Sequence, residues 1–182
     1  TWVNGLFAFY NIANRTVLYT TQKDYKEPSY GLAFYHQSTV KNLLVKHLSA
    51  TLGLRMDIER DKQDYKIWAI KNGNKTLESQ LNDRMSFTQF TPKLSLQYQF
   101  DKNNMTYATI TRGYKTGGFN VSFTSDDERT YKPEYSWNYE VGGKVSMFDG
   151  KIQSDLALFY IDWRHQQISH KIPTGQILDR KS

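Results

Sequence analysis

The stretch that decides the fold is Leu48-Ser-Ala-Thr-Leu-Gly-Leu-Arg-Met-Asp-Ile-Glu-Arg60, because apolar and polar residues alternate along it. Its even positions from 48 to 58 are all apolar, and its odd positions from 49 to 59 are polar or Gly. Successive residues of a strand point to opposite faces. The stretch therefore predicts a long strand with one apolar face and one polar face.

The same alternation predicts two more strands, one from Lys93 to Phe100 and one from Tyr139 to Met147. Aromatic and β-branched residues favour four further strands with mixed faces. These run from Trp2 to Tyr10, Tyr30 to Val40, Asn104 to Tyr114 and Lys151 to Trp163. No sustained apolar stripe at helical spacing is present, so we predict an all-β chain of seven strands, and an eighth could start near Ile168.

The connections between these strands alternate strictly between short and long. Short turns are expected at Lys41 to Lys46, Asp101 to Asn104 and Asp149-Gly150, and long polar loops at Asn11 to Ser29, Asp61 to Met85 and Lys115 to Tyr135. In an antiparallel up-and-down meander this order places all long loops at one end of the sheet. Short turns at one end and long loops at the other are typical of outer-membrane β-barrels.

Aromatic residues support the barrel interpretation. The chain has 13 Tyr, 10 Phe and 4 Trp, too many for a disordered segment. Several stand at the strand ends, where barrels carry two aromatic girdles. They are Phe100 and Phe148 before short turns, and Tyr10, Tyr30, Tyr114, Trp137 and Trp163 near long loops. The alternative is that these aromatics form the core of a soluble extracellular β-sandwich, a binding or adhesion module that would fold without detergent.

Several stretches resemble the barrel domain of TonB-dependent outer-membrane receptors. The most specific are Tyr107-Ala-Thr-Ile-Thr-Arg-Gly-Tyr-Lys-Thr-Gly-Gly-Phe-Asn120 and Tyr131-Lys-Pro-Glu-Tyr-Ser-Trp-Asn-Tyr-Glu-Val-Gly-Gly-Lys144. Similar pieces are Leu52-Gly-Leu-Arg-Met-Asp57, Pro92-Lys-Leu-Ser-Leu-Gln-Tyr98, Phe148-Asp-Gly-Lys151 and Leu156-Ala-Leu-Phe-Tyr-Ile-Asp-Trp163. The resemblance runs from about Trp2 to Gln167.

This resemblance implies a section of a plugged barrel of about 22 strands in the outer membrane of a Gram-negative bacterium. Such receptors bind a scarce ligand, such as an iron–siderophore chelate, haem, cobalamin or a glycan, and import it with energy delivered through TonB. We expect residues 1–182 to be an internal part of the barrel, with about seven or eight strands, because no plug domain, energy-coupling motif or closing strand is recognisable. The implied partners are membrane lipid, the plug, the remaining strands, the TonB complex and a small ligand such as a ferric siderophore.

Strand parity and the loops then give candidate site residues. The apolar face of the 48–60 stretch would meet lipid, and the opposite face would line the lumen. The predicted lumen-facing residues are Thr51, Arg55, Asp57, Glu59, Lys93, Gln97, Glu140 and Lys144. Cationic and aromatic residues at the lumen mouth suit an anionic ferric chelate. The predicted ligand-binding residues are Tyr65, Trp68, Arg112, Tyr114, Lys115 and Phe119.

Other chemistry finds little support in the residues. The absence of Cys excludes a disulfide framework and a thiolate nucleophile, and the four His residues show no ligand spacing for a metal. Acidic and basic residues interleave, which argues against nucleic-acid binding despite the net charge of +6. No acid–base or nucleophile constellation is recognisable, so we expect neither enzyme activity nor a cofactor.

Overall fold

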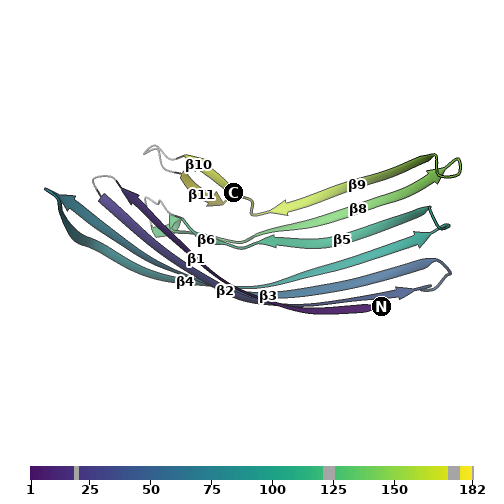
Figure 1. Ribbon diagram of the computed structural model, residues 1–182, viewed down its shortest axis with the longest axis horizontal. Helices are drawn as coiled ribbons and strands as arrows, with labels where there is room; N and C mark the ends of the chain where they lie inside the picture. The colour runs from purple at the N-terminus through teal and green to yellow at the C-terminus, as the bar shows by residue number, and fades with distance from the viewer. Residues whose placement is uncertain (19–20, 121–125, 172–176, 182) are drawn as a thin grey trace. The chain divides into compact units, whose positions relative to one another are not determined.

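The computed structural model describes residues 1–18, 21–120, 126–171 and 177–181, which are mostly β-structure. Seven strands form one sheet whose order, β1-β2-β3-β4-β5-β8-β9, follows the chain (Figure 1). The registers of β4–β5, β5–β8 and β8–β9 are antiparallel. This confirms the predicted all-β meander. The strands are β1 (Trp2–Leu18), β2 (Thr21–Lys41), β3 (Leu48–Lys71), β4 (Asn74–Gln99), β5 (Met105–Lys115), β8 (Glu134–Met147) and β9 (Ile152–Arg164).

Short elements make up the rest of the described chain. β6 (Gly118–Phe119) pairs with β7 (Thr130–Tyr131), and the 3-10 turn η1 (Asp126–Glu128) precedes β7. The strand expected near Ile168 exists as β10 (Gln167–Lys171), but it pairs with β11 (Ile177–Lys181) and does not join the seven-stranded sheet. Among the described residues, no helix is long and apolar enough to cross a membrane.

The predictions of two of the three long loops were wrong, because these regions consist mainly of strands. β1 and β2 continue through most of residues 11–29, and β3 and β4 through most of residues 61–85. A tight turn at Asn72 and Gly73, with φ of 51° and 79°, joins β3 to β4. The prediction failed because it required an apolar face. Backbone pairing continues without one, and both faces of these extensions carry polar side chains.

The three predicted short turns were correct. Residues 42–47 and 100–104 lie between strands without strand structure of their own. In the third turn Asp149 and Gly150 have φ of 53° and 84°, and the Lys151 N–H donates to the Phe148 carbonyl at 3.2 Å. Two central residues with positive φ are the signature of the primed hairpin turn that Asp-Gly indicates.

The chain divides into two compact units, described separately below. The first unit comprises residues 1–5, 34–56 and 89–182, and the second comprises residues 6–33 and 57–88. In the second unit the buried residues lie on β2, β3 and β4 and have odd numbers, and the apolar ones among them are Tyr25, Ala33, Tyr65, Ala69 and Phe87. In the first unit the large apolar side chains are mostly exposed.

Candidate functional site

One face of the first unit is apolar and exposed. The register places Leu96 opposite Ala108, Ala108 opposite Val141, and Val141 opposite Leu158, so these four form one row across the sheet. Leu96, Val141 and Leu158 are 42%, 53% and 66% exposed. A second row contains Leu94, Ile110, Tyr139 and Tyr160. A continuous exposed apolar face of this kind marks a surface that meets another apolar phase.

The opposite face of the first unit is polar and internally hydrogen-bonded. The Tyr107 hydroxyl donates to Glu140 Oε1 at 2.7 Å, and Ser95 Oγ and Thr109 Oγ1 are 2.9 Å apart. Gln97 Nε2 donates to Gln99 Oε1 at 3.1 Å. The register puts all of these on one face with two further residues predicted to face the lumen, Lys93 and Lys144.

The other residues predicted to face the lumen lie on β3. Thr51 Oγ1 is 2.9 Å from Thr39 Oγ1, and a Cβ built at Gly53 would lie 3.4 Å from Lys93 Cβ. Strand alternation therefore puts Thr51 and Arg55 on the face of Lys93. Asp57 and Glu59 follow at the same parity in the second unit, where Asp57 is buried. The shared face agrees with a lumen lining, which stays a prediction.

Arg112 contacts several neighbouring residues near the C-terminal end of β5 in the first unit. Its guanidinium lies 4.8 Å from the centre of the Tyr135 ring, and its Nη1 donates to the Phe90 carbonyl at 3.1 Å. Gln89 Nε2 donates to the Tyr135 hydroxyl at 2.9 Å, and His165 packs edge-on against the same ring. Arg112 was predicted from the sequence, but Tyr135 was not. The contact between the two side chains depends on how β5 and β8 pair, which only the folded sheet shows.

A polar clasp fixes the start and end of the connection between β5 and β8. The Gln167 N–H donates to Glu134 Oε2 at 2.6 Å, and its side-chain amide donates to the carbonyls of Thr116 and Lys132. Glu134 is only 6% exposed. Asn120 Nδ2 donates to the Glu128 carbonyl at 2.6 Å. Three of the predicted ligand-binding residues lie next to these contacts in the chain, Tyr114 and Lys115 at the end of β5 and Phe119 in β6.

The other two predicted ligand-binding residues lie in the second unit, on opposite faces of β3. Tyr65 is buried and stacks on Tyr25 with ring centres 4.7 Å apart. Trp68 lies on the even-numbered face, where its indole N–H donates to Asp24 Oδ2 at 2.9 Å. Lys75 Nζ lies 4.4 Å from the centre of the Trp68 ring. The structure thus does not bring Tyr65 and Trp68 to one surface.

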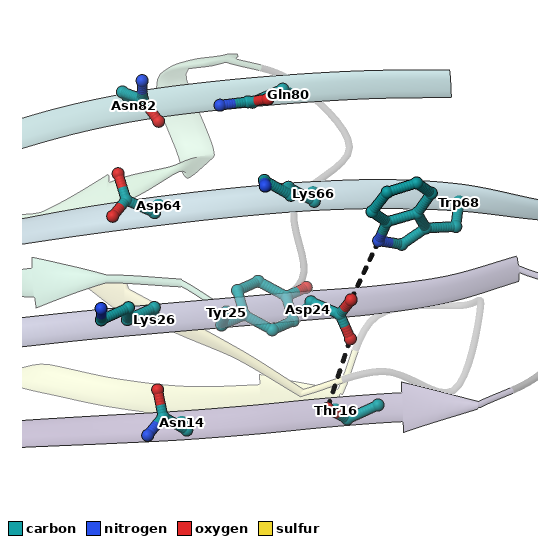
Figure 2. Close-up of a pocket in the computed structure, with 10 residues that line it drawn as sticks. All are labelled: Asn14, Thr16, Asp24, Tyr25, Lys26, Asp64, Lys66, Trp68, Gln80 and Asn82. Carbon is teal, nitrogen blue, oxygen red and sulfur yellow. Dashed lines mark hydrogen bonds between the residues drawn. The ribbon is translucent and has the colours of Figure 1, made fainter. Parts of the chain in front are cut away.

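Trp68 borders a polar hollow of about 580 Å³ on the even-numbered face (Figure 2). Asp24 is at its centre and accepts hydrogen bonds from Gln22, Trp68 and Thr16. The Gln22 amide is the main cause that lowers the pKa of Asp24, with Trp68 and Lys75 adding to it and partial burial opposing it. Polar side chains of four strands line the hollow: Asn14, Thr16, Asp24, Lys26, Asp64, Lys66, Gln80 and Asn82.

The comparison with protein families identifies the fold to which this geometry belongs. The family described as TonB dependent receptor-like, beta-barrel, matches residues 2–177. The chain belongs to this family. A TonB-dependent receptor barrel lies in the outer membrane of a Gram-negative bacterium, and this assignment accounts for the exposed apolar face.

A solved structure of similar fold agrees with the family match. The ferric yersiniabactin uptake receptor FyuA from Yersinia pestis is 20% identical with a TM-score of 0.72, and the match covers 92% of this chain and 26% of that chain. The identity is low, so this likeness shows the fold alone. The ferric-catecholate import receptor Fiu from E. coli K12 is 10% identical with a TM-score of 0.45, covering 98% of this chain and 34% of that chain. A TM-score this low does not establish a shared fold.

Proposed function

We propose that this chain is a section of an outer-membrane active-transport receptor that binds an iron–siderophore chelate and imports it with TonB-coupled energy. The observation that carries the proposal is the family match over residues 2–177. The ligand class is proposed by analogy with the ferric yersiniabactin uptake receptor, whose fold this chain shares. The chain spans 26% of that receptor, so the plug, the remaining strands and the TonB complex act as partners through parts outside this chain.

Ligand recognition is assigned to the outer end of β5 and to the β3–β4 extension. Lys115 is exposed, while Arg112 already contacts Tyr135 and Phe90. Lys115 is therefore the free cation in this pair that can form a charge-assisted hydrogen bond to an anionic chelate. In the first unit, Tyr114 and Phe119 would add aromatic contacts near Lys115. In the second unit, Trp68 would offer a separate aromatic contact beside the polar hollow, and buried Tyr65 would act through the packing that holds the extension.

The test uses the complete receptor and a panel of ferric siderophore chelates, with binding measured by quenching of intrinsic Trp and Tyr fluorescence. Lys115→Ala is expected to weaken binding of the recognised chelate by about tenfold, the effect of about 1.4 kcal/mol. Lys102→Ala is the matched control, because Lys102 lies in a short turn at the opposite end of β5. If none of the chelates binds saturably, the proposed ligand class is contradicted.

TonB coupling is tested separately by uptake of the bound chelate in cells with and without a working TonB complex. We expect uptake to stop without TonB while binding to the cell surface continues. Equal uptake in both strains would contradict active transport and leave the binding result unaffected.

The polar face is proposed to line the lumen against the plug. Charged residues on a barrel lumen tune ion selectivity, whereas the lipid face does not. In a plug-deleted receptor, Lys93→Glu should shift the pore toward cations, and Leu94→Gln should leave its selectivity unchanged. The opposite ranking in planar-bilayer conductance would contradict the assignment.

The soluble β-sandwich is the weaker interpretation. A sandwich requires two sheets packed face to face, whereas the seven long strands of the described chain lie in a single sheet. The family is one of receptors and transporters, not of enzymes.

A further inference from the structure

Between residues 57 and 62 of β3, in the second unit, acidic and basic side chains lie on opposite faces. Asp57, Glu59 and Asp61 have odd numbers, and Arg60 and Lys62 have even numbers. Alternation along the strand directs the two sets to opposite sides. Asp57 and Asp61 are buried, whereas Arg60 is exposed. Over residues 57–62 the exposed face therefore carries the cations and the buried face carries the acids, and Asp64 follows on the exposed face.

Arg84 of β4 joins these two cations on the exposed face. Arg60, Lys62 and Arg84 border one hollow of about 360 Å³, together with Tyr30 and Ser86. We call these three basic residues the cationic row. Within the described part of the chain, no carboxylate forms an ion pair with any side chain of the cationic row.

The hollow also touches Asp61 and Met85, which have the opposite parity. Asp61 is only 8% exposed, and its odd number places its side chain on the buried face of the strand. It forms no ion pair with the cationic row within the described residues.

The cationic row begins where the exposed apolar surface of the second unit ends. Ile58 precedes Arg60 by two residues on the same face and is 37% exposed. Tyr30 borders the hollow, and Leu32, two residues further along β2, is 55% exposed. In a membrane barrel such apolar side chains meet acyl chains, so the cations directly beyond them lie at headgroup level.

We infer that the cationic row binds the anionic, phosphate-bearing headgroup of a lipid in the leaflet that surrounds the barrel. Arg guanidinium groups form paired hydrogen bonds to phosphate oxygens, and Lys62 adds a point charge. The hydroxyls of Tyr30 and Ser86 border the same hollow and supply further donors. A zwitterionic headgroup is a poorer fit, because its ammonium group adds a positive charge beside three cations whose side chains form no ion pair within the described residues.

The test is native mass spectrometry of the complete receptor, titrated with phosphatidylglycerol or phosphatidylcholine. The wild type is expected to retain phosphatidylglycerol in preference to phosphatidylcholine. A cation near a membrane surface contributes about a fivefold gain in anionic-lipid binding, so the triple variant Arg60→Gln, Lys62→Gln and Arg84→Gln should lose about a hundredfold. The matched control removes three other cations of the second unit that lie near Asp24 or Asp64, by Lys26→Gln, Lys66→Gln and Lys75→Gln.

The control should keep most of the lipid preference, because its cations face acidic neighbours. An equal loss in both triple variants would overturn the inference and indicate a general charge effect. Displacement of phosphatidylglycerol by equimolar inorganic phosphate would also overturn it, by revealing a site for free anions. If the triple variant fails to fold, the single variants Arg60→Gln and Arg84→Gln decide, each with an expected loss of about fivefold; no loss in either would refute the site.

Discussion

Replacing Leu96 by Arg probes the apolar face at the β4 end of its row. Leu96 is 42% exposed and has Ala108 as its register partner. The adjacent positions across the sheet are Val141 and Leu158, so a guanidinium at 96 has no polar neighbour in its row. An Arg on the lipid face near the bilayer midplane costs about 2–4 kcal/mol. This corresponds to a decrease of about 30-fold to about 700-fold in the folding equilibrium constant.

Gln97→Arg is the matched control, since residue 97 points to the polar face. It loses the hydrogen bond from Gln97 to Gln99, which contributes about 1 kcal/mol, and keeps a polar side chain among polar neighbours. The assay is urea unfolding of the complete receptor in lipid vesicles. We expect Leu96→Arg to lower the free energy of unfolding by at least about 1 kcal/mol more than Gln97→Arg. Equal losses, or a larger loss for Gln97→Arg, would refute the assignment of the two faces.

Three further predictions concern turns and close contacts. The hydrogen bond from the Asn104 amide is the main cause that lowers the pKa of Asp101. The stabilisation from this contact is therefore fully present above the ordinary carboxyl pKa and is lost as the pH falls through the lowered pKa. If NMR shows that Asp101 titrates at or above the ordinary carboxyl pKa, this prediction is contradicted. Gly150→Ala should lower the melting temperature, because φ of 84° costs a residue with a Cβ about 1 kcal/mol; an unchanged melting temperature would disprove this strain. Gly142→Ala should also destabilise, because its Cβ would lie 2.6 Å from the Tyr107 ring, and combining it with Tyr107→Ala should remove part of that loss in a double-mutant cycle.

The sequence predicted the fold best where a strand has one apolar face. Leu94 and Leu96 alternate with Lys93 and Gln97, and the structure separates these two pairs onto the two faces of the sheet. The turn at Asp149-Gly150 was equally predictable, because few residues other than Asp, Asn and Gly adopt positive φ at low cost.

The extensions of β1 to β4 could not be predicted in the same way. Lys66 and Trp68 share a face of β3 with Asp64. The side chains thus alternate between two faces in the structure, but the hydrophobicity of the sequence does not alternate with them. Loop and strand sequences look alike when both faces are polar, and only the pairing partner distinguishes them.

The candidate site depended on contacts between strands distant in sequence. Trp68 contacts Asp24, 44 residues away, and Gln89 contacts Tyr135, 46 residues away. No spacing rule connects such pairs, because register is a property of the folded sheet. The sequence therefore indicated candidate residues for a barrel mouth, which stay a prediction, and left their partners undetermined.

The most direct test of the central claim is a single-cysteine scan along β8 from Tyr139 to Lys144 in the complete receptor reconstituted in lipid vesicles. This section of chain contains no native Cys, so none of its own residues competes with the introduced one. We predict that a water-soluble maleimide reacts at 140, 142 and 144 and not at 139, 141 and 143. A quencher dissolved in the lipid should act on labels at 139, 141 and 143 and not on labels at the other three positions. Equal reaction at all six positions, or the reversed phase, would contradict a membrane barrel with its polar face toward the lumen.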